Sequence, residues 1–158
     1  MKLFPPKILF VCLGNICRSP LAEALLKHKT NTQNWLIDSA GLDSWHLGEP
    51  PCDLTRRILT ENGIQTEHRA RLFNTKDFDK FDLIYVMDHQ NLQQVLNMAR
   101  NDNDRAKVNL ILNEIFPGEN LDVPDPYMQN QAAIQQVYHL LDAATDQIAQ
   151  KFNHENKR

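Results

Sequence analysis

The sequence predicts one α/β domain over residues 1–158, a three-layer sandwich with a four-stranded parallel sheet. Three observations predict this class. The chain has 158 residues, a common length for a single domain, and its 42% hydrophobic and 23% charged residues are close to the globular average. Short apolar runs alternate with longer segments of helical periodicity, which is typical of strands joined by crossover helices.

The predicted strands are four apolar runs of about five or six residues. Because polar and apolar residues do not alternate within them, they favour strands that helices cover on both faces. Strands joined in this way give a Rossmann-like fold, in which ligands bind at the carboxyl edge of the sheet. The runs span residues 7–12, 35–39, 82–87 and 108–112.

Four segments with helical periodicity lie between and after these runs. Ser19 and Pro20 predict the start of the first, because serine caps helix N-termini and proline fits the first turn. Gly63 predicts the end of the second, since glycine accepts the left-handed conformation that closes a helix. The four segments span residues 19–28, 54–62, 90–100 and 131–152.

Two of the remaining segments, 101–105 and 153–158, are polar. The third helix is expected to fade into the stretch 101–105, and residues 153–158 are expected to be a frayed tail. Loops 41–53 and 113–130 are long for a compact domain, and loops of this length are often functional.

Charge and hydropathy exclude two classes of partner. The 17 basic and 20 acidic residues are mixed along the chain and give a net charge of −3, so no basic surface for nucleic acid is expected. The longest apolar stretch near the N-terminus, 8–11, is far shorter than the roughly 20 residues that span a bilayer, and no cleavage site follows it. We expect a soluble, unprocessed cytoplasmic protein that binds neither nucleic acid nor membranes.

The number of cysteines does not indicate a fold held together by disulfides. Cys12, Cys17 and Cys52 are an odd number in a chain too large to need covalent stapling, so reduced thiols are expected. No second pair of cysteines or histidines at suitable spacing completes a zinc site, and no metal is expected.

The segment 11–20, which joins the first strand to the first helix, carries the chemistry. Its backbone N–H groups can converge on an anion, and the helix N-terminus behind them adds partial positive charge. Gly14 gives a tight loop the backbone freedom it needs, and Arg18 can bind an oxyanion with a planar two-pronged donor. The segment therefore predicts a phosphate-binding loop.

Cys12 lies at the base of this loop, where the dipoles that hold an anion also stabilise a thiolate. A lone cysteine at a strand end is usually a small buried hydrophobic residue. Gly14, Arg18 and Ser19 together favour a nucleophile aimed at a bound phosphoryl group.

The segment 11–20 closely resembles the phosphate-binding loop of the low-molecular-weight protein tyrosine phosphatase family. The resemblance continues in family order and at near-family spacing through residues 37–41, 63–64, 68–71, 81–82, 87–88 and 125–127. Members hydrolyse phosphotyrosine through a cysteinyl-phosphate, without a metal, on a four-stranded parallel sheet. The resemblance implies that fold and activity here, with no cofactor.

By this resemblance, Cys12 is the nucleophile, Arg18 binds the phosphate and the transition state, and Asp125 is the general acid. A carboxyl group on a loop constrained by Pro124 and Pro126 can be held over the scissile oxygen. The resemblance also implies phosphate binding by Leu13, Gly14, Asn15, Ile16, Cys17 and Arg18, a supporting network of Ser19, Asn15, Ser39 and His68, and substrate walls formed by Leu13, Ile16, Trp45 and Tyr127.

Two further positions bear on regulation and specificity. Cys17 lies in the same closed loop as Cys12, and a neighbouring thiol can condense with a sulfenic acid before irreversible oxidation occurs. We expect Cys17 to protect Cys12 in this way, as the resemblance also implies. Met128 stands where many animal members carry a second tyrosine, which argues against a phosphorylation switch there.

Two alternatives fit part of the pattern. A thioredoxin-coupled arsenate reductase needs two further cysteines in a mobile segment past mid-chain, whereas here Cys17 lies inside the loop and Cys52 in a different segment. A non-catalytic phosphotyrosine-binding module would keep the loop and lose the catalytic groups, which are all present. We expect the substrate to be a tyrosine-phosphorylated protein or a small aryl phosphate. The physiological substrate and the oligomeric state stay open.

Overall fold

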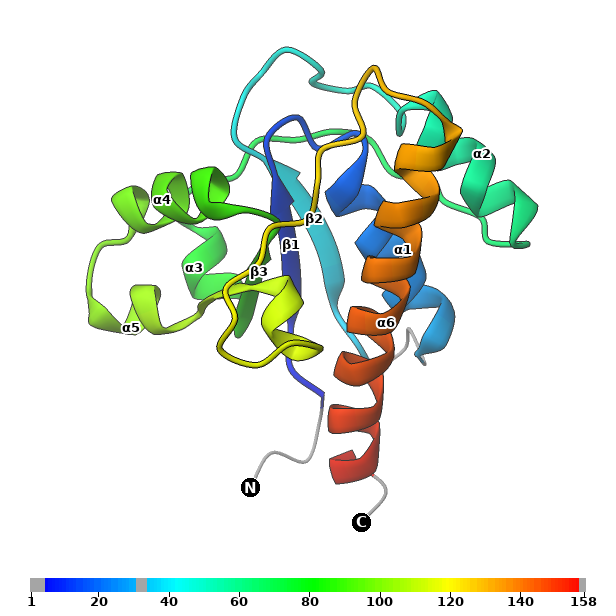
Figure 1. Ribbon diagram of the computed structural model, residues 1–158. Coiled ribbons are helices and arrows are strands. Elements are labelled where there is room, and N and C mark those ends of the chain that lie inside the picture. Colours follow the sequence, from blue (N-terminus) through cyan, green and yellow to red (C-terminus); the bar gives the residue numbers. More distant parts are fainter. Residues whose placement is uncertain (1–4, 31–33, 157–158) are drawn as a thin grey trace.

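The computed structural model describes residues 5–30 and 34–156. They form three layers, with a parallel sheet between two groups of helices (Figure 1). Each strand runs parallel to the neighbour it pairs with, which confirms the predicted fold class. The strand order is β2-β1-β3-β4, and the strands are β1 (Ile8–Cys12), β2 (Ile37–Gly41), β3 (Leu83–Val86) and β4 (Val108–Leu110).

The strand order places the site at one edge of the sheet. From β1 the chain crosses to β2 on one side and then returns to β3 on the other side of β1. At such a switch point the carboxyl ends of neighbouring parallel strands leave a crevice for a ligand. Cys12 pairs in register with Gly41, so the end of β2 lies beside the start of the predicted phosphate-binding loop.

Helices cover both faces of the sheet, as Figure 1 shows. On one side lie α1 (Arg18–Lys29), α2 (Asp53–Glu61) and α6 (Gln131–Asn156), and on the other α3 (Asp77–Lys80), α4 (His89–Met98) and α5 (Asp102–Ala106).

Alternate residues of β1 belong to two separate cores. Ile8 and Phe10 join the core that includes apolar residues of α1 and α6, whereas Leu9 and Val11 join the core on the opposite face. All four side chains are fully buried. This double burial explains why the strand is a continuous apolar run.

The start of α1 differs in its chemistry from the prediction. The helix begins at Arg18, and no side chain caps it. The Ser19 hydroxyl, which the sequence predicts as the cap, accepts a hydrogen bond from Asn15 Nδ2 at 2.8 Å and lies 2.9 Å from Cys12 Sγ. The predicted serine cap is therefore wrong, because this hydroxyl serves the loop.

Several boundaries also shift. The fourth strand ends at Leu110, and the 3₁₀ helix η1 (Ile111–Glu114) replaces the rest of the predicted run. Helix α3 was not predicted, and α5 begins in the stretch 101–105, into which the third helix was expected to fade. The Asn101 side chain caps α5 by accepting a hydrogen bond from the backbone N–H of Asp104 at 2.8 Å.

The C-terminal helix is longer than expected. α6 continues to Asn156, whereas the sequence predicts a frayed tail from Asn153, and residues 157–158 lie outside the described part of the chain. None of the described helices is long and apolar enough to cross a membrane.

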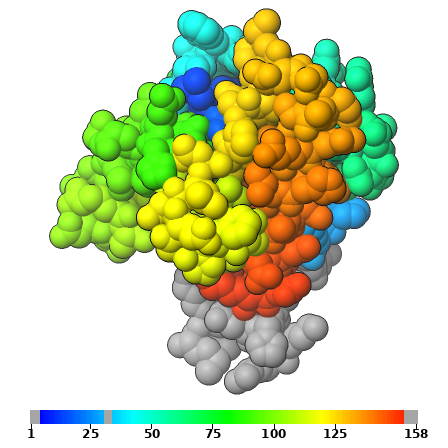
Figure 2. All heavy atoms as spheres, in the orientation of Figure 1, coloured from blue at the N-terminus to red at the C-terminus, as the bar shows by residue number. Residues whose placement is uncertain are grey.

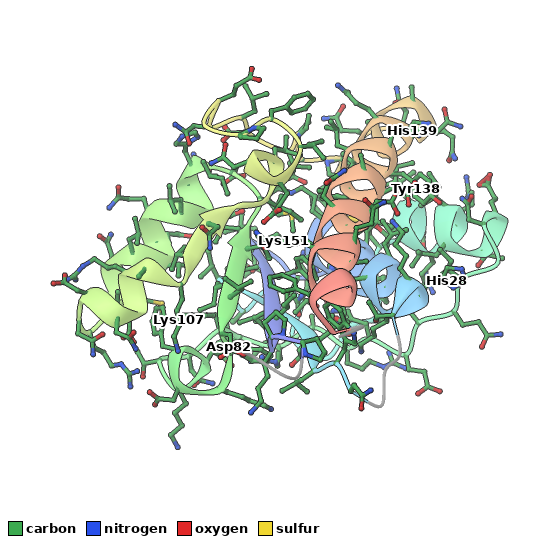
Figure 3. All side chains as sticks on the ribbon, turned by 90° about the horizontal axis from the view of Figure 1, so that it is seen from below. His28, Asp82, Lys107, Tyr138, His139 and Lys151 are labelled. Carbon is green, nitrogen blue, oxygen red and sulfur yellow. A yellow bond between two sulfur atoms is a disulfide. The ribbon has the colours of Figure 1, made fainter. Side chains whose placement is uncertain are left out.

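The amino-terminal edge of the sheet, seen from below in Figure 3, carries contacts that join neighbouring elements. The Asp82 carboxylate accepts a hydrogen bond from the backbone N–H of Lys7 at 2.8 Å, and Lys107 Nζ donates to the carbonyl of Phe78. These contacts fix the ends of the strands. The reactive groups predicted from the sequence lie at the opposite edge.

Candidate active site

The loop formed by residues 12–18 leaves the carboxyl end of β1 and enters α1. In the space-filling view it lies between the two long loops, 41–53 in cyan and 113–130 in yellow and gold (Figure 2). A pocket of about 120 Å³ opens on it. The pocket is lined by Cys12, Leu13, Gly14, Ile16, Cys17, Arg18, Asp43, Trp45, His46, Asp125 and Tyr127. The predicted nucleophile, arginine, acid and walls are therefore brought together.

Asn15 determines the shape of the loop. Its backbone is left-handed, with a φ of 57°, and the residue is 1% exposed. Its Nδ2 donates to Ser19 Oγ at 2.8 Å and to Ser39 Oγ at 3.0 Å, and its Oδ1 accepts from the backbone N–H of Arg71 at 2.9 Å. The Asn15 carbonyl accepts a hydrogen bond from His68 Nε2 at 2.8 Å. These contacts join the residues of the predicted supporting network and hold a strained conformation in place.

The Cys12 thiol is buried, and its Sγ lies 2.9 Å from Ser19 Oγ. Because Ser19 Oγ already accepts a hydrogen bond from Asn15, its own O–H is free to donate to the sulfur. A thiolate at Cys12 would therefore have a hydrogen-bond donor as well as the N-terminus of α1 beside it. This arrangement suits a sulfur nucleophile.

Arg18 is 3% exposed and is held from two sides. Its Nη1 donates to Asp88 Oδ2 at 2.9 Å and to the carbonyl of Val123 at 2.8 Å. Its Nη2 lies 3.8 Å from Asp125 Oδ2. The guanidinium plane is thus fixed at the pocket, as binding of phosphate oxygens by a planar fork requires. Asp88 is a partner that the sequence analysis did not assign.

Asp125 lies at the mouth of the pocket, and its side chain is half exposed. Its Oδ1 accepts a hydrogen bond from the backbone N–H of Tyr127 at 3.0 Å, which leaves Oδ2 on the side of Arg18. A carboxyl group in this position can exchange a proton with a ligand bound beside Arg18.

His46 is a site residue that the sequence analysis missed. Its ring makes an edge contact with the ring of Tyr127, with centroids 5.5 Å apart, and its Nδ1 lies 3.2 Å from Glu49. A Cβ on Gly14 would come within 3.2 Å of His46 Cδ2. His46, in loop 41–53, therefore lies against both the loop 12–18 and loop 113–130. Its only sequence signal was its place beside Trp45.

Glu23, on the buried side of α1, completes the supporting network. Its Oε1 accepts from Ser39 Oγ at 2.5 Å and lies 3.3 Å from His68 Nδ1, and its Oε2 accepts from Lys27 Nζ at 2.7 Å. Burial raises the pKa of Glu23, but the hydrogen bonds from His68, Lys27 and Ser39 outweigh it and lower the pKa from 4.5 to about 2. A buried acid on a helix gives no local signal of such a role.

Gly41 fits the loop by having no side chain. A Cβ at this position would lie 2.8 Å from Asn15 Cβ and 2.9 Å from the Leu13 carbonyl oxygen. The Gly41 backbone carbonyl accepts a hydrogen bond from the N–H of Phe73, and its own N–H donates to Arg71. The end of β2 therefore supports the loop from below at van der Waals contact.

The cysteines correct the expectation of reduced thiols. Cys17 forms a disulfide with Cys52, and their Cα atoms are 5.4 Å apart. Cys12 is the free cysteine. Cys52 lies in a different segment, as the sequence analysis noted, but loop 41–53 folds back against the loop 12–18 and brings Cys52 to Cys17.

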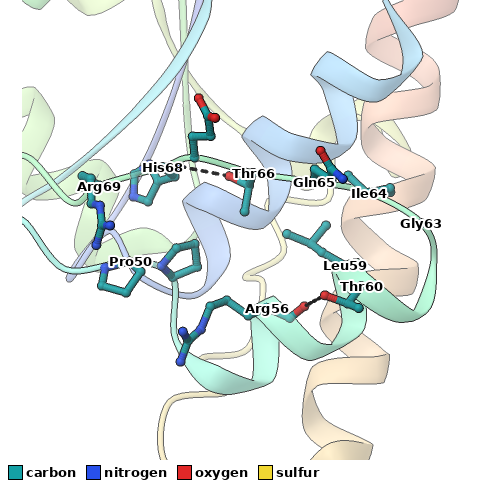
Figure 4. Close-up of a pocket in the computed structure, with 12 residues that line it drawn as sticks. Pro50, Arg56, Leu59, Thr60, Gly63, Ile64, Gln65, Thr66, His68 and Arg69 are labelled. Atoms are coloured by element: carbon teal, nitrogen blue, oxygen red, sulfur yellow. Dashed lines mark hydrogen bonds between the residues drawn. The ribbon is translucent and has the colours of Figure 1, made fainter.

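A larger and more open hollow of about 820 Å³ lies between α2 and residues 63–69 (Figure 4). His68 lines it, but its Nε2 already donates to Asn15. The dashed hydrogen bonds in Figure 4 join Thr60 to the Arg56 carbonyl and the His68 N–H to Thr66, which are local contacts. This hollow brings no nucleophile and acid together.

Comparison with known proteins gives a consistent result. A family model described as low molecular weight phosphotyrosine protein phosphatase matches residues 7–158. A protein of that name from Schizosaccharomyces pombe is 43% identical over 126 residues, which cover 77% of this chain and 80% of the relative. The one from Sus scrofa is 42% identical over 137 residues, which cover 83% and 85%.

Solved structures match over nearly the whole chain. A protein tyrosine phosphatase from Entamoeba histolytica with Hepes in the active site superimposes with a TM-score of 0.86 at 32% identity, covering 96% of this chain and 99% of that one. A Drosophila arginine phosphatase superimposes with a TM-score of 0.84 at 35% identity, covering 92% and 97%.

The fit of Gly41 against the loop gives the first prediction. Gly41→Ala should displace Asn15 and lower kcat/KM for nitrophenyl phosphate by about tenfold or more, because small displacements of a site are costly. Gly63→Ala is the matched control, since Gly63 has a φ of 71° and open space around it. It should lose about 1 to 2 kcal/mol of stability, because alanine is strained in the left-handed conformation, and keep its activity. Equal activity in the two variants would contradict the proposed fit.

The depressed pKa of Glu23 gives a prediction on stability. The carboxylate stabilises the fold fully above its unfolded pKa near 4.5, and this contribution is lost as the pH falls toward its folded pKa of about 2. It amounts to about 3 kcal/mol at most. The free energy of unfolding, measured with urea, should therefore fall more between pH 4.5 and pH 2 for the wild type than for Glu23→Gln. The exposed control Glu119→Gln should follow the wild type, and parallel curves for Glu23→Gln would overturn the assignment.

Proposed function

The chain belongs to the low molecular weight phosphotyrosine protein phosphatase family, and we propose that it hydrolyses phosphotyrosine and aryl phosphates through a cysteinyl-phosphate at Cys12. The observation that carries the proposal is that the Cys12 thiol, the Arg18 guanidinium and the Asp125 carboxyl group all line one small pocket. A nucleophile, a fixed cation and a proton donor are what a two-step hydrolysis of a phosphate monoester needs.

In the first step the Cys12 thiolate attacks phosphorus and the bond from phosphorus to the phenolic oxygen breaks. Protonated Asp125 gives its proton to the departing oxygen. Arg18 and the N–H groups of the loop bind the phosphoryl oxygens on which charge develops. Since Asp88 and the Val123 carbonyl already orient Arg18, little reorganisation is needed when the substrate binds.

In the second step water attacks the phosphorus of the cysteinyl-phosphate. The Asp125 carboxylate, now deprotonated, takes a proton from that water, as microscopic reversibility requires. The sulfur–phosphorus bond breaks and Cys12 leaves as a thiolate, to which the Ser19 hydroxyl donates a hydrogen bond. Inorganic phosphate is released, and the original protonation states are restored.

The mouth of the pocket is proposed to bind the aromatic ring. Leu13 is 39% exposed, Tyr127 43% and Trp45 86%, so apolar surface is open to a ligand at the loop. His46 holds the Tyr127 ring from the side. Apolar walls favour a phenyl ring over the charged guanidinium of phosphoarginine, the other substrate chemistry that a similar structure suggests.

The alternatives are less well supported. A non-catalytic phosphotyrosine-binding module would need no general acid, whereas Asp125 lies beside Arg18 at the pocket. Membership of the phosphatase family and this acid both favour hydrolysis over arsenate reduction. The cytoplasmic location stays a prediction from the sequence, and the proposed partner is a tyrosine-phosphorylated protein or a small aryl phosphate.

The role of Cys12 is tested by separating turnover from binding. Cys12→Ser should lower turnover by at least about a thousandfold, because serine has no thiolate to offer. Affinity for a phosphotyrosine peptide, measured by calorimetry, should change little, since Arg18 and the loop N–H groups remain. A phosphoenzyme trapped on any residue other than Cys12 would refute the assignment.

The role of Asp125 is tested with two leaving groups. Asp125→Asn should slow phosphotyrosine hydrolysis by about 10²- to 10⁴-fold and nitrophenyl phosphate hydrolysis less, because nitrophenol is a more acidic leaving group that needs less proton assistance. The wild-type pH profile should be bell-shaped, and the variant should lose its basic limb. An equal loss on both substrates would point to a structural role.

A further inference from the structure

Two cysteines of the phosphate-binding loop, Cys12 and Cys17, are joined there by Cys52 from loop 41–53. Cys12 and Cys17 line the same pocket, and Cys17 is joined to Cys52 across 35 residues of sequence. Cys17 therefore shares a pocket with Cys12 and a covalent bond with Cys52. A cysteine of the active-site loop that is shared in this way can exchange partners.

Cys52 is held firmly in this position. Its backbone N–H donates to the carbonyl of Ile16 at 2.7 Å, so loop 41–53 is bonded directly to the phosphate-binding loop. Thr55 Oγ1 donates to the Cys17 carbonyl at 3.0 Å and lies 3.4 Å from Cys52 Sγ. These hydrogen bonds hold the backbones of Cys17 and Cys52 next to each other independently of the disulfide.

We propose that Cys52 is the terminal thiol of a relay that removes peroxide oxidation from Cys12 and leaves it in the Cys17–Cys52 disulfide. The relay rests on the proposed function only in taking Cys12 as a reactive thiolate. It differs from simple protection by Cys17, because Cys12 is a reduced thiol again when the relay is complete and is free to act.

The relay has three steps. The Cys12 thiolate attacks an oxygen of hydrogen peroxide, the O–O bond breaks, and a sulfenic acid and, after protonation, one water form. Cys17 then attacks Cys12 Sγ, the S–O bond breaks, and the hydroxyl leaves as water with the Cys17 proton. Cys52 finally attacks Cys17 Sγ, so that Cys12 leaves as a thiolate. In sum, two thiols and one peroxide give one disulfide and two waters.

The surroundings of the three sulfurs favour the last step. Cys12 is a good leaving group because the Ser19 hydroxyl and the N-terminus of α1 stabilise its thiolate. Cys52 is the N-cap residue of the nine-residue helix α2, and its side chain makes no capping hydrogen bond. The partial positive charge of that helix end favours an attacking thiolate at Cys52. Cys52 is also more exposed than the buried Cys12 and Cys17, so an external dithiol can reach it.

The test follows the position of the disulfide and the activity together. Fully reduced protein is treated with hydrogen peroxide, free thiols are alkylated, and tryptic peptides are mapped by mass spectrometry. Trypsin leaves Cys12 and Cys17 on one peptide, 8–18, and Cys52 on another, 30–56. A relay that is complete therefore crosslinks two peptides, whereas a relay that stops at Cys17 gives an internal disulfide in one.

In the peptide map, the wild type should give crosslinked peptides in which Cys12 is alkylated. In the activity assay, it should keep its turnover of nitrophenyl phosphate through the first equivalent of peroxide and lose it with the second. Reduced Cys52→Ser should turn over as the wild type does. After one equivalent it should carry the internal Cys12–Cys17 disulfide and be about tenfold less active until dithiothreitol is added.

An internal disulfide in the oxidised wild type, a crosslink through Cys12, or equal resistance of wild type and Cys52→Ser would each overturn the relay. The proposed function is judged separately, from the turnover of reduced wild type and reduced Cys12→Ser before peroxide is added. Failure of the relay therefore leaves that result untouched, and an active Cys12→Ser would refute the phosphatase mechanism alone.

Discussion

The left-handed backbone of Asn15 is the constraint on which the rest of the site depends. A residue other than glycine keeps this conformation only where its surroundings fix it. Here the Asn15 side chain is bonded to Ser19 and Ser39, and its carbonyl to His68. Because these partners come from α1, β2 and the segment after α2, the loop takes its shape from the assembled fold. The same bonds leave the Ser19 hydroxyl one direction in which to donate, toward Cys12.

Asp125, the proposed general acid, depends on the loop in a similar way. The Val123 N–H donates to the Met87 carbonyl at the end of β3, and the Val123 carbonyl accepts from Arg18. One residue in loop 113–130 is therefore bonded to the sheet on one side and to Arg18 on the other. Asp125 follows two residues later and lies 3.8 Å from Arg18. The backbone hydrogen bonds of Val123 therefore set the distance between Asp125 and Arg18. The side chain of Asp125 does not take part in this anchoring.

The sequence predicted those features whose signal is local. β1 is a continuous apolar run because both of its faces are buried, and Gly63 ends α2 because its φ is 71°. The helices α3 and α5 were not predicted, because segments of four or five residues are too short to show the periodicity of apolar residues that marks a helix. Ser19 was misread because a serine at a helix start has the same local sequence whether it caps the helix or faces a thiol. The contacts of Glu23, His46 and Cys52 are made between distant segments, and no local pattern records them.

The bottom and the mouth of the pocket are built by different means. Cys12, Asn15 and Arg18 are at most 3% exposed. Asn15 and Arg18 are each held by hydrogen bonds from more than one segment, and Cys12 Sγ lies against the Ser19 hydroxyl. Trp45 and Tyr127, which line the mouth, are 86% and 43% exposed, and they belong to loops 41–53 and 113–130. The buried, hydrogen-bonded bottom of the pocket keeps the proposed reacting groups in one geometry whatever the substrate. Exposed apolar side chains on loops can instead adapt to different surfaces. The contact between His46 and Tyr127 links the two loops, so the two sides of the mouth are coupled above a pocket bottom whose geometry is fixed separately.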